Sequence, residues 1–330
     1  MQELSRTSVR DLVQNMIGNT LRIWKGSVFN LKILVIGGSY FLGRVFVMQA
    51  ASEHEITVVN RGTYSMENFG VKQITGDRRN PATWNCCDGD YDVLVDFCAY
   101  CKGDVSFVLN HLSGTVRQYI MISTVDVYEH GGDGLKSEDS PFEMREIAGE
   151  AGEYIKGKIA LEQELISECT RREISYTILR PSILYGPFNY APRESVYIQM
   201  IVQNHILPHI TDAKARFQMV YVKDVADAIR KCLLNENAIG QVYNICNETP
   251  IDYHILFECL KEVADVPFQE ILMTVNQATE QNVPLSFPVT AEETNLCAGA
   301  KSINDLGLNY TDLSDGMLKT YRAFKNVFVD

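Results

Sequence analysis

A tyrosine and a lysine that could act together in proton transfer stand four residues apart, at Tyr154 and Lys158. Residues at this spacing share one face of a helix, so the two side chains would lie close together. A phenol ionises near pH 10, which is too high for base chemistry at neutral pH, and a neighbouring ammonium group would lower its pKa. Chance also produces such pairs, so the pair indicates catalysis only in a suitable context.

Two hydroxyl side chains, Ser123 and Thr124, directly follow the apolar segment 118–122. This segment is predicted to be a strand, and open α/β sheets bind their ligands at the carboxyl ends of strands. A hydroxyl group at that edge could donate a hydrogen bond to the oxygen of a reacting substrate. The sequence therefore predicts catalytic roles for Ser123 and Thr124 beside Tyr154 and Lys158.

A glycine-rich segment lies between a strand predicted at 33–36 and a helix predicted at 40–52. Glycines allow the backbone to turn tightly and to approach a pyrophosphate, and the N-terminus of the following helix offers free N–H groups and a positive dipole end. Because the segment opens the first strand–helix–strand unit, it predicts a dinucleotide site. We expect this site to contain Gly37, Gly38, Ser39, Tyr40, Phe41, Leu42 and Gly43.

The end of the next predicted strand indicates which dinucleotide the chain prefers. An acidic residue at this position would hold the ribose 2′-hydroxyl of NAD and repel the 2′-phosphate of NADP. The chain has Asn60 followed by Arg61, so the local charge favours NADP over NAD. The alternative interpretation is that Arg61 is simply a solvated surface residue.

The segments that must position these residues alternate between strands and helices. Short apolar runs predict strands at 33–36, 55–59, 71–75, 93–97, 118–122 and 175–179, with helices at 40–52, 103–112 and 150–171. Such alternation is typical of a parallel sheet covered by helices on both faces. After Pro181 the pattern weakens, and we expect strands at 217–222 and 242–246 and helices at 225–234, 251–264 and 312–328. The predicted class is α/β, a Rossmann-type doubly wound parallel sheet with a smaller C-terminal substrate-binding α/β region.

This pattern divides the chain into three parts. Residues 1–30 are an N-terminal extension. A short amphipathic helix is predicted there, because apolar residues recur at helical spacing at Val9, Leu12, Val13, Met16 and Ile17. This helix would either pack on the body of the protein or dock a partner. Residues 31–186, with 217–235 returning to them, are predicted to be the NAD(P)-binding domain. Residues 187–216 and 236–330 are predicted to be the substrate-binding domain.

The composition disfavours several classes of protein. The chain has 330 residues, of which 46% are hydrophobic and 22% charged, as in ordinary globular proteins. Its net charge of −12 disfavours a general nucleic-acid partner, because an acidic surface repels phosphate backbones. We find neither an apolar run long enough to cross a membrane nor a segment of signal-peptide type. Nine scattered cysteines fit reduced thiols, so we expect a cytoplasmic protein. A homodimer is compatible with the sequence, which does not determine the oligomeric state.

Seven motifs, taken in order, resemble those of the extended short-chain dehydrogenase/reductases, the NAD-dependent epimerase/dehydratase family. They read I-L-V-I-G-G-S-Y-F-L-G, V-V-N-R-G, G-D-R, I-S-T-V-D-V-Y, Y-I-K-G-K, L-R-P-S-I-L-Y-G-P and V-Y-V-K-D-V-A-D-A-I, and the resemblance spans residues 32–265. The glycine loop is most similar to the atypical branch whose loop reads G-G-T-R-F-I/L-G. A set of motifs in this order is far more specific for the fold than for one reaction.

The resemblance implies a role for each residue that matches a family motif. Tyr154 would be the general acid/base, Lys158 would hold the nicotinamide ribose and lower the Tyr154 pKa, and Thr124 would be the active-site hydroxyl. Further cofactor contacts would come from Asn60, Arg61, Asp77, Arg78, Phe97, Cys98, Ala99, Lys158 and Pro181. The chain departs from the family twice. Tyr40 replaces the middle glycine of the usual loop, and Ile183 replaces an asparagine that contacts the substrate diphosphate in sugar-nucleotide enzymes.

The implied function is that of an NAD(P)-dependent epimerase, dehydratase or reductase. It would act on a hydroxyl or carbonyl carbon of a sugar or nucleotide-sugar. We expect substrate contacts from Tyr185, Arg193 and Arg216, and the alternative for the two arginines is that they form surface salt bridges. The alternative is an RNA-binding protein or a non-catalytic dinucleotide-sensing scaffold, because some relatives in this branch have such roles. The intact set of Thr124, Tyr154 and Lys158 argues against an inactive scaffold.

Three other patterns resemble metal sites, but we predict no metal. Cys98 and Cys101 have redox or zinc spacing, yet the chain has no second pair of this kind. His205 and His209 are spaced as on one helix face, but Pro208 would break that helix. The beginning of a calcium loop, without its final glutamate, is present at Asp88, Asp90 and Asp92.

Overall fold

The computed structural model describes residues 30–132 and 134–328. The amphipathic helix predicted between Val9 and Ile17 lies outside these residues. The chain from Leu31 onward forms one compact unit, and all of the described helices and strands belong to it.

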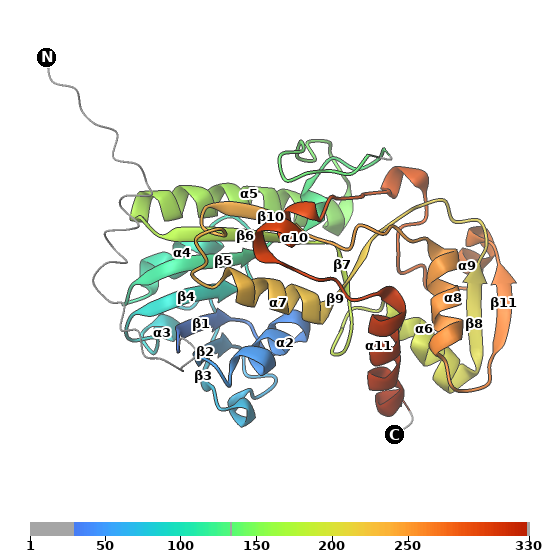
Figure 1. The fold of residues 1–330 in the computed structure, drawn as a ribbon, viewed down its shortest axis with the longest axis horizontal. Helices are drawn as coiled ribbons and strands as arrows, with labels where there is room; N and C mark the ends of the chain where they lie inside the picture. Colours follow the sequence, from blue (N-terminus) through green and yellow to red (C-terminus); the bar gives the residue numbers. More distant parts are fainter. Residues whose placement is uncertain (1–29, 133, 329–330) are drawn as a thin grey trace, which may run out of the picture. The chain divides into compact units, whose positions relative to one another are not determined.

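A seven-stranded parallel sheet forms the centre of this unit (Figure 1). Its strands are β1 (Lys32–Ile36), β2 (Glu55–Asn60), β3 (Lys72–Thr75), β4 (Tyr91–Asp96), β5 (Val116–Ile122), β6 (Ser175–Pro181) and β10 (Gln241–Ile245). They lie in the order β10-β6-β5-β4-β1-β2-β3. The chain reverses its direction of progress across the sheet between β1 and β4, and doubly wound sheets bind ligands at such a point. The predicted fold class is confirmed.

Helices cover both faces of this sheet, as Figure 1 shows. Those on one face are α2 (Phe41–Ala50) and α7 (Val222–Cys232), and those on the other are α3 (Pro81–Trp84), α4 (Asp104–His111) and α5 (Gly149–Arg172). Successive residues of β1 point to opposite faces, so the strand contributes to two cores. Ile33 and Val35 pack in the core on the α2 side, and Leu34 and Ile36 pack in the core on the α5 side.

The C-terminal half adds two small parallel sheets beside the main one. One pairs β7 (Ile183–Tyr185) with β9 (Met219–Tyr221), and the other pairs β8 (Ile206–Ile210) with β11 (Gln269–Met273). The helices of this half are α6 (Glu194–Gln199), α8 (Tyr253–Val263), α9 (Val275–Glu280), α10 (Ala300–Leu306) and α11 (Leu313–Phe328). Shorter helical turns are η1 (Glu67–Phe69), η2 (Val125–Val127), η3 (Met200–Asn204) and η4 (Ala291–Glu293).

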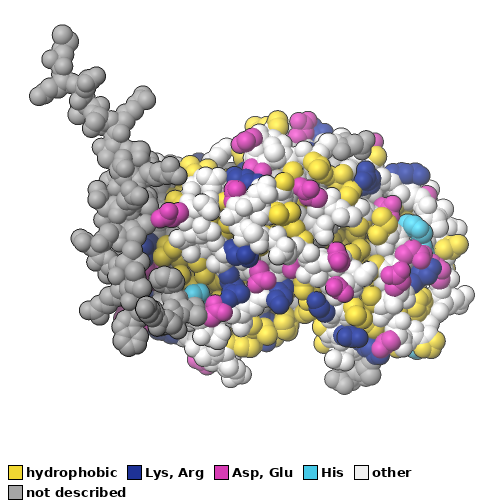
Figure 2. Space-filling view, viewed as in Figure 1, with side chains coloured by type: hydrophobic (Ala, Val, Ile, Leu, Met, Phe, Trp, Pro, Cys, Tyr) yellow, Lys and Arg dark blue, Asp and Glu magenta, His cyan; other side chains and the backbone are white. Residues whose placement is uncertain are grey.

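Most predicted elements of the main sheet differ from the observed ones only at their ends. In the C-terminal half, the strand predicted at 217–222 shortens to β9, and α7 already begins at Val222. No described helix is both long enough and apolar enough to cross a membrane. On the face drawn in Figure 2, basic and acidic side chains are interspersed.

Candidate active site

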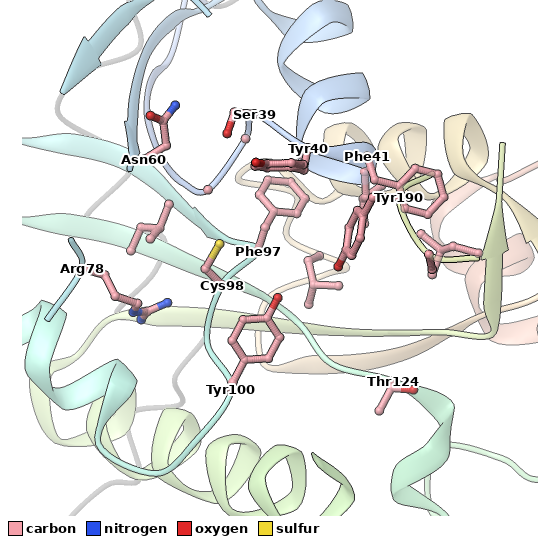
Figure 3. Close-up of a pocket in the computed structure, with 18 of the residues that line it drawn as sticks. Ser39, Tyr40, Phe41, Asn60, Arg78, Phe97, Cys98, Tyr100, Thr124 and Tyr190 are labelled. Carbon is pink, nitrogen blue, oxygen red and sulfur yellow. The ribbon is translucent and has the colours of Figure 1, made fainter. Parts of the chain in front are cut away.

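A cavity of about 900 Å³ opens at the carboxyl ends of β1, β2, β4, β5 and β6. In Figure 3, Asn60 and Arg78 lie on one side of it and Thr124 on the other, with Cys98 and Tyr100 between them. The wall contains most of the predicted site residues, which are Gly37, Gly38, Ser39, Tyr40, Phe41, Leu42, Gly43, Asn60, Arg61, Asp77, Arg78, Phe97, Cys98, Ser123, Thr124, Tyr154, Lys158, Pro181 and Arg193.

The glycine loop packs its main chain directly against neighbouring elements. Gly37 and Gly38 have φ angles of +99° and +78°, in the left-handed region that favours glycine. A Cβ on Gly37 would lie 2.6 Å from Cys98 Sγ, and a Cβ on Gly43 would lie 2.7 Å from the Cα of Gly38. Side chains at these positions would force the loop away from β4 and α2, so the close packing requires the glycines.

Tyr40, at the middle of this loop, links two walls of the cavity. It occupies the N-cap position of α2 without a capping side-chain hydrogen bond, and it is 41% exposed. Its ring meets Tyr64 edge-to-face at a centroid distance of 5.0 Å and Tyr190 at 6.0 Å. Tyr190 belongs to segment 187–193 of the predicted substrate-binding domain, and Figure 3 shows its ring beside that of Tyr40. The tyrosine that replaces the family's glycine therefore contacts the segment 187–193 across the cavity.

The end of β2 presents an amide group and a guanidinium group to the cavity. Asn60 Oδ1 accepts a hydrogen bond of 2.7 Å from the N–H of Gly62, which fixes the turn after the strand. Asn60 Nδ2 is buried and has no hydrogen-bond partner among the described residues. A buried donor without a partner is costly, and a ligand hydroxyl or phosphate oxygen could satisfy it. Arg61 is exposed in the cavity wall and forms no ion pair with any described residue.

The guanidinium of Arg78 also lies in the wall, but Asp96 holds it. The two Nη atoms of Arg78 donate to the two carboxylate oxygens of Asp96, both at 2.8 Å. Asp96 is fully buried and also accepts a hydrogen bond of 2.6 Å from the Tyr119 hydroxyl. A bidentate pair of this kind fixes the orientation of the arginine. The edge of the Arg78 guanidinium that faces Asp96 is therefore not free for the predicted cofactor contact. Asp77 and Arg79 also line the wall.

At the opposite end, a threonine, a tyrosine and an aspartate lie together. Thr124 follows β5, and its Oγ1 donates to Asp126 Oδ2 at 2.9 Å while accepting from the Asp126 N–H at 3.2 Å. Tyr154 lies on the second turn of α5. All three side chains line the cavity, so the structure brings the predicted Thr124 and Tyr154 together and adds a carboxylate beside them.

The environment of Tyr154 raises the pKa of its hydroxyl. Although 38% of the residue is exposed, partial burial is the largest cause, and the negative charge of Asp126 adds to it. Hydrogen bonding to Thr124 and the positive charge of Arg193 oppose the rise without cancelling it. Tyr154 therefore carries its proton at neutral pH, and the predicted lowering of its pKa by Lys158 does not outweigh burial in this structure.

Lys158 lies one turn further along α5 and is 3% exposed. Its Nζ donates hydrogen bonds to the main-chain carbonyls of Ala99 at 2.8 Å and Ile122 at 2.9 Å. Ala99 is thus a main-chain partner of Lys158, not part of the cavity wall. An ammonium group has three donors, so one remains for a ligand. Burial lowers the pKa of Lys158 to about 8, although the nearby Asp96 acts in the opposite direction.

The hydroxyl of Ser123 is held behind the wall. It donates to Glu162 Oε1 at 2.5 Å, and Arg180 Nε donates to the same oxygen at 2.9 Å. None of the three residues is more than 3% exposed. In this structure the proton of the Ser123 hydroxyl is committed to Glu162, so the geometry does not support the catalytic role predicted for Ser123, which stays a prediction. The neighbouring Thr124 also lines the cavity, and its Oγ1 is bonded to Asp126.

Only one of the three predicted substrate residues, Arg193, lines the cavity. Tyr185 is 1% exposed and packs in the core against Tyr221, and Arg216 is an exposed residue outside the wall. The lining of this cavity therefore does not support the substrate contacts predicted for Tyr185 and Arg216, and both stay predictions. The residue types were suitable for binding, but their position in the fold places them elsewhere.

The wall also contains polar and aromatic residues that the sequence analysis did not single out, namely Thr63, Arg79, Tyr100, Asp104, Asp126, Ser182, Asn189 and Tyr190. A signal existed for Asp126, because it lies two residues after Thr124 within the motif I-S-T-V-D-V-Y. Tyr100 lies between Cys98 and Cys101, the two cysteines that have redox or zinc spacing. No sequence signal marked Asn189, whose Nδ2 donates to Glu194.

The structure also shows the surroundings of two of the three patterns that resembled metal sites. Burial raises the pKa of the Cys98 thiol to about 11, and Cys101 Sγ accepts a hydrogen bond from Arg79. His205 ends the helical turn η3, whereas His209 lies within β8, so the two histidines do not share a helix face.

Comparison with known proteins places the chain in a family. Residues 33–246 match the NAD dependent epimerase/dehydratase family, and the chain belongs to that family. A curated relative, chloroplast stem-loop binding protein of 41 kDa b from Arabidopsis thaliana, is 27% identical over 261 residues, which cover 73% of this chain and 65% of the relative. The chain therefore matches less than two thirds of that relative's length.

Two further proteins illustrate the range of the similarity. 2'-Dehydrokanamycin reductase from Streptomyces kanamyceticus is 20% identical over 260 residues, covering 76% of this chain and 72% of the reductase. The crystal structure of UDP-glucuronic acid 4-epimerase from Bacillus cereus, in complex with UDP-glucuronic acid and NAD, is similar with a TM-score of 0.69 and 19% identity, over 90% of this chain and 100% of that one. The structural similarity supports the fold.

Proposed function

We propose that the protein is an NAD(P)-dependent enzyme that oxidises or reduces a hydroxyl-bearing or carbonyl carbon of a sugar-like substrate. One observation carries this proposal. Thr124, Tyr154 and Lys158 line the same cavity as the glycine loop. Family membership supports the same class of chemistry. Epimerisation, dehydration and simple reduction all begin from this arrangement.

The residues at the nucleotide end fit a dinucleotide. The glycine loop allows close approach to main-chain N–H groups at the start of α2, where anions bind favourably. Asn60 Nδ2 is a buried donor that a ribose oxygen would satisfy. When bound, the nicotinamide would accept or supply the hydride.

Arg61 supports a preference for NADP over NAD. Its guanidinium lies in the wall at the end of β2, and no described carboxylate neutralises it. A 2′-phosphate would gain a charge-assisted hydrogen bond there, whereas a 2′-hydroxyl would gain only a neutral one. Asn60, which replaces an acidic residue at the strand end, does not repel the phosphate.

At the catalytic end, each side chain has a distinct task. Tyr154 carries its proton at neutral pH, because burial and Asp126 raise its pKa, so it is prepared to protonate a substrate oxygen during reduction. Thr124 Oγ1 would hydrogen-bond the same oxygen. Lys158 is charged below about pH 8 and has one donor free for the ribose. Arg193 adds a positive charge on the substrate side, which suits an anionic sugar derivative.

The proposal is tested by titrating the purified protein with NADPH and NADH, and then supplying a panel of sugars, keto-sugars and nucleotide-sugars. We expect stoichiometric binding of NADPH, and hydride transfer or isomerisation with at least one sugar-like compound. Failure to bind either dinucleotide would contradict the proposal. Binding without reaction across the panel would favour a dinucleotide-sensing scaffold.

RNA binding is a second candidate function, because the name of the Arabidopsis relative states that it binds a stem-loop. The charge of −12 and the interspersed charges in Figure 2 disfavour it. A mobility-shift assay with a stem-loop RNA at physiological salt separates the two candidates. We expect no shift of the RNA band at micromolar protein. A shift that competing RNA abolishes, and that NADPH does not, would favour RNA binding.

A further inference from the structure

A second cluster of ionisable side chains lies on the C-terminal two-stranded sheet, away from the cavity. His209 is on β8, His254 and Glu258 are on α8, and Glu270 is on β11. His254 and Glu258 are four residues apart, so they share one face of the helix. Figure 2 shows histidine surrounded by acidic and basic side chains over the region of α8 and β8. None of these residues lines the cavity.

The distances within this cluster fit a bound transition metal. His209 Nε2 lies 3.2 Å from His254 Nδ1. Two zinc–nitrogen bonds of about 2.0–2.1 Å at a tetrahedral angle separate their nitrogens by about 3.3 Å. A carboxylate oxygen of Glu258 completes a set of three ligand atoms that lie within 4.8 Å of one another. Small side-chain rotations therefore suffice to bring all three onto one ion.

A carboxylate behind the cluster already orients the buried histidine. His209 is 6% exposed, and its Nδ1 lies 2.6 Å from Glu270 Oε1. This contact directs the other ring nitrogen, Nε2, toward His254. Metal-binding histidines commonly have a carboxylate partner on the second nitrogen, which fixes the ring and raises its basicity. The arrangement is that of a histidine prepared as a ligand.

We propose that His209 Nε2, His254 Nδ1 and a Glu258 carboxylate oxygen bind a divalent transition-metal ion of the Zn²⁺ type, with water as the fourth ligand. Two imidazoles and one carboxylate suit Zn²⁺ better than Mg²⁺ or Ca²⁺, which prefer oxygen ligands alone. Lys261 Nζ now donates to Glu258 at 2.9 Å and to Glu270 at 3.2 Å. On metal binding, the Glu258 carboxylate would leave Lys261 and bind the ion, while Lys261 would remain hydrogen-bonded to Glu270.

The expected role of the ion is structural. It would join α8 to β8 across 45 residues of sequence, in a part of the fold held by a sheet of only two strands. It supplies no group to the cavity, so it would act on the stability of the C-terminal region. This inference does not depend on the proposed function, and it departs from the sequence prediction of no metal.

The test uses the full chain, stripped with a chelator and titrated calorimetrically with Zn²⁺. We expect one site of micromolar affinity, and His254→Ala and Glu258→Gln should each weaken it by at least about tenfold. Both residues are at least partly exposed, so these variants should remain folded. His205→Asn is the matched control, because His205 is four residues from His209, lies outside the cluster and has a positive φ that asparagine tolerates.

Two further readouts separate this site from the nine cysteines. Co²⁺ bound at the cluster should give a visible spectrum without the intense near-ultraviolet band of thiolate ligation. Zn²⁺ at a hundredfold its dissociation constant should raise the unfolding midpoint of the unmodified chain by about 5 °C, and that of His254→Ala much less. Three results would each overturn the proposal. They are an unchanged Zn²⁺ affinity in both cluster variants, thiolate bands with Co²⁺, and a lack of stoichiometric binding at about 100 µM Zn²⁺, a concentration at which only a weak surface site would stay unsaturated.

Discussion

The nucleotide end and the catalytic end of the cavity rest on two similar buried networks. At the first, Arg78 is paired with Asp96, which also binds the Tyr119 hydroxyl. At the second, Arg180 is paired with Glu162 and bonds the Tyr128 hydroxyl. In each case the buried network forms hydrogen bonds with one residue that the sequence motif had predicted to contact the ligand.

The two ends differ in the kind of group that is left free. The first network takes the guanidinium of Arg78 and leaves Arg61 as a cationic group. The second takes the hydroxyl of Ser123 and leaves its neighbour Thr124. A motif thus indicates which residue types lie near a ligand, whereas the buried partners decide which of them can bind it.

The largest difference in the effect of substitution on kcat is expected between Thr124 and Ser123. Thr124→Val should lower kcat by roughly 10²-fold, because it removes the hydrogen bond to the reacting oxygen. Thr124→Ser should restore most of the activity. Ser123→Ala should leave kcat within a few-fold and lower the free energy of unfolding by about 1–3 kcal/mol, because it leaves Glu162 short of a donor. Steady-state kinetics and urea denaturation measure the two effects, and a larger loss of kcat in Ser123→Ala would reverse the assignment.

A similar contrast is expected between the two arginines. Arg61→Ala should weaken NADPH binding by about tenfold or more and leave NADH binding nearly unchanged, since one charge-assisted bond contributes about 1.5–3 kcal/mol. Arg78→Met should instead destabilise the fold by about 3–5 kcal/mol, because Asp96 loses its buried partner. Fluorescence titration with both dinucleotides and thermal unfolding distinguish the outcomes. Equal weakening of NADPH and NADH in Arg61→Ala would show that Arg61 does not read the 2′-phosphate.

The smallest effect concerns the pH dependence of cofactor binding. Burial lowers the pKa of Lys158 to about 8, from an ordinary value of 10.5. Below about pH 8 the ammonium is already charged and can donate to a ribose, whereas above it a proton must be taken up on binding. Affinity for NADPH should therefore be constant from pH 6 to about 7.5 and fall several-fold by about pH 9. Lys158→Met should bind more weakly and lose this dependence, and a flat profile in the unmodified chain would contradict the assignment.

The main sheet could be predicted from sequence because its buried strands are continuous apolar runs, such as Ile33 to Ile36. The strand β8 could not, since it contains Pro208 and pairs with β11, which comes about 60 residues later. The sequence analysis rejected His205 as a partner of His209 because of Pro208, but it could not indicate His254, which the fold brings next to His209.

Within the site, the motifs predicted the glycine loop and the neighbourhood of Tyr154, because each is a short segment with strict local geometry. The availability of each group depends on partners distant in sequence. Glu162 lies 39 residues from Ser123, and Asp96 lies 18 residues from Arg78. Such pairings are properties of the packed fold, and no local pattern of residues indicates them.

The central claim is that Tyr154 exchanges the proton in a dinucleotide-dependent reaction, and Tyr154→Phe tests it most directly. The phenyl ring preserves the packing near Lys158 and removes only the hydroxyl. With the substrate found in the panel, we expect NADPH affinity to change by less than about twofold and kcat to fall by at least roughly 10²-fold. Retention of kcat within a few-fold, with NADPH still bound, would contradict the account.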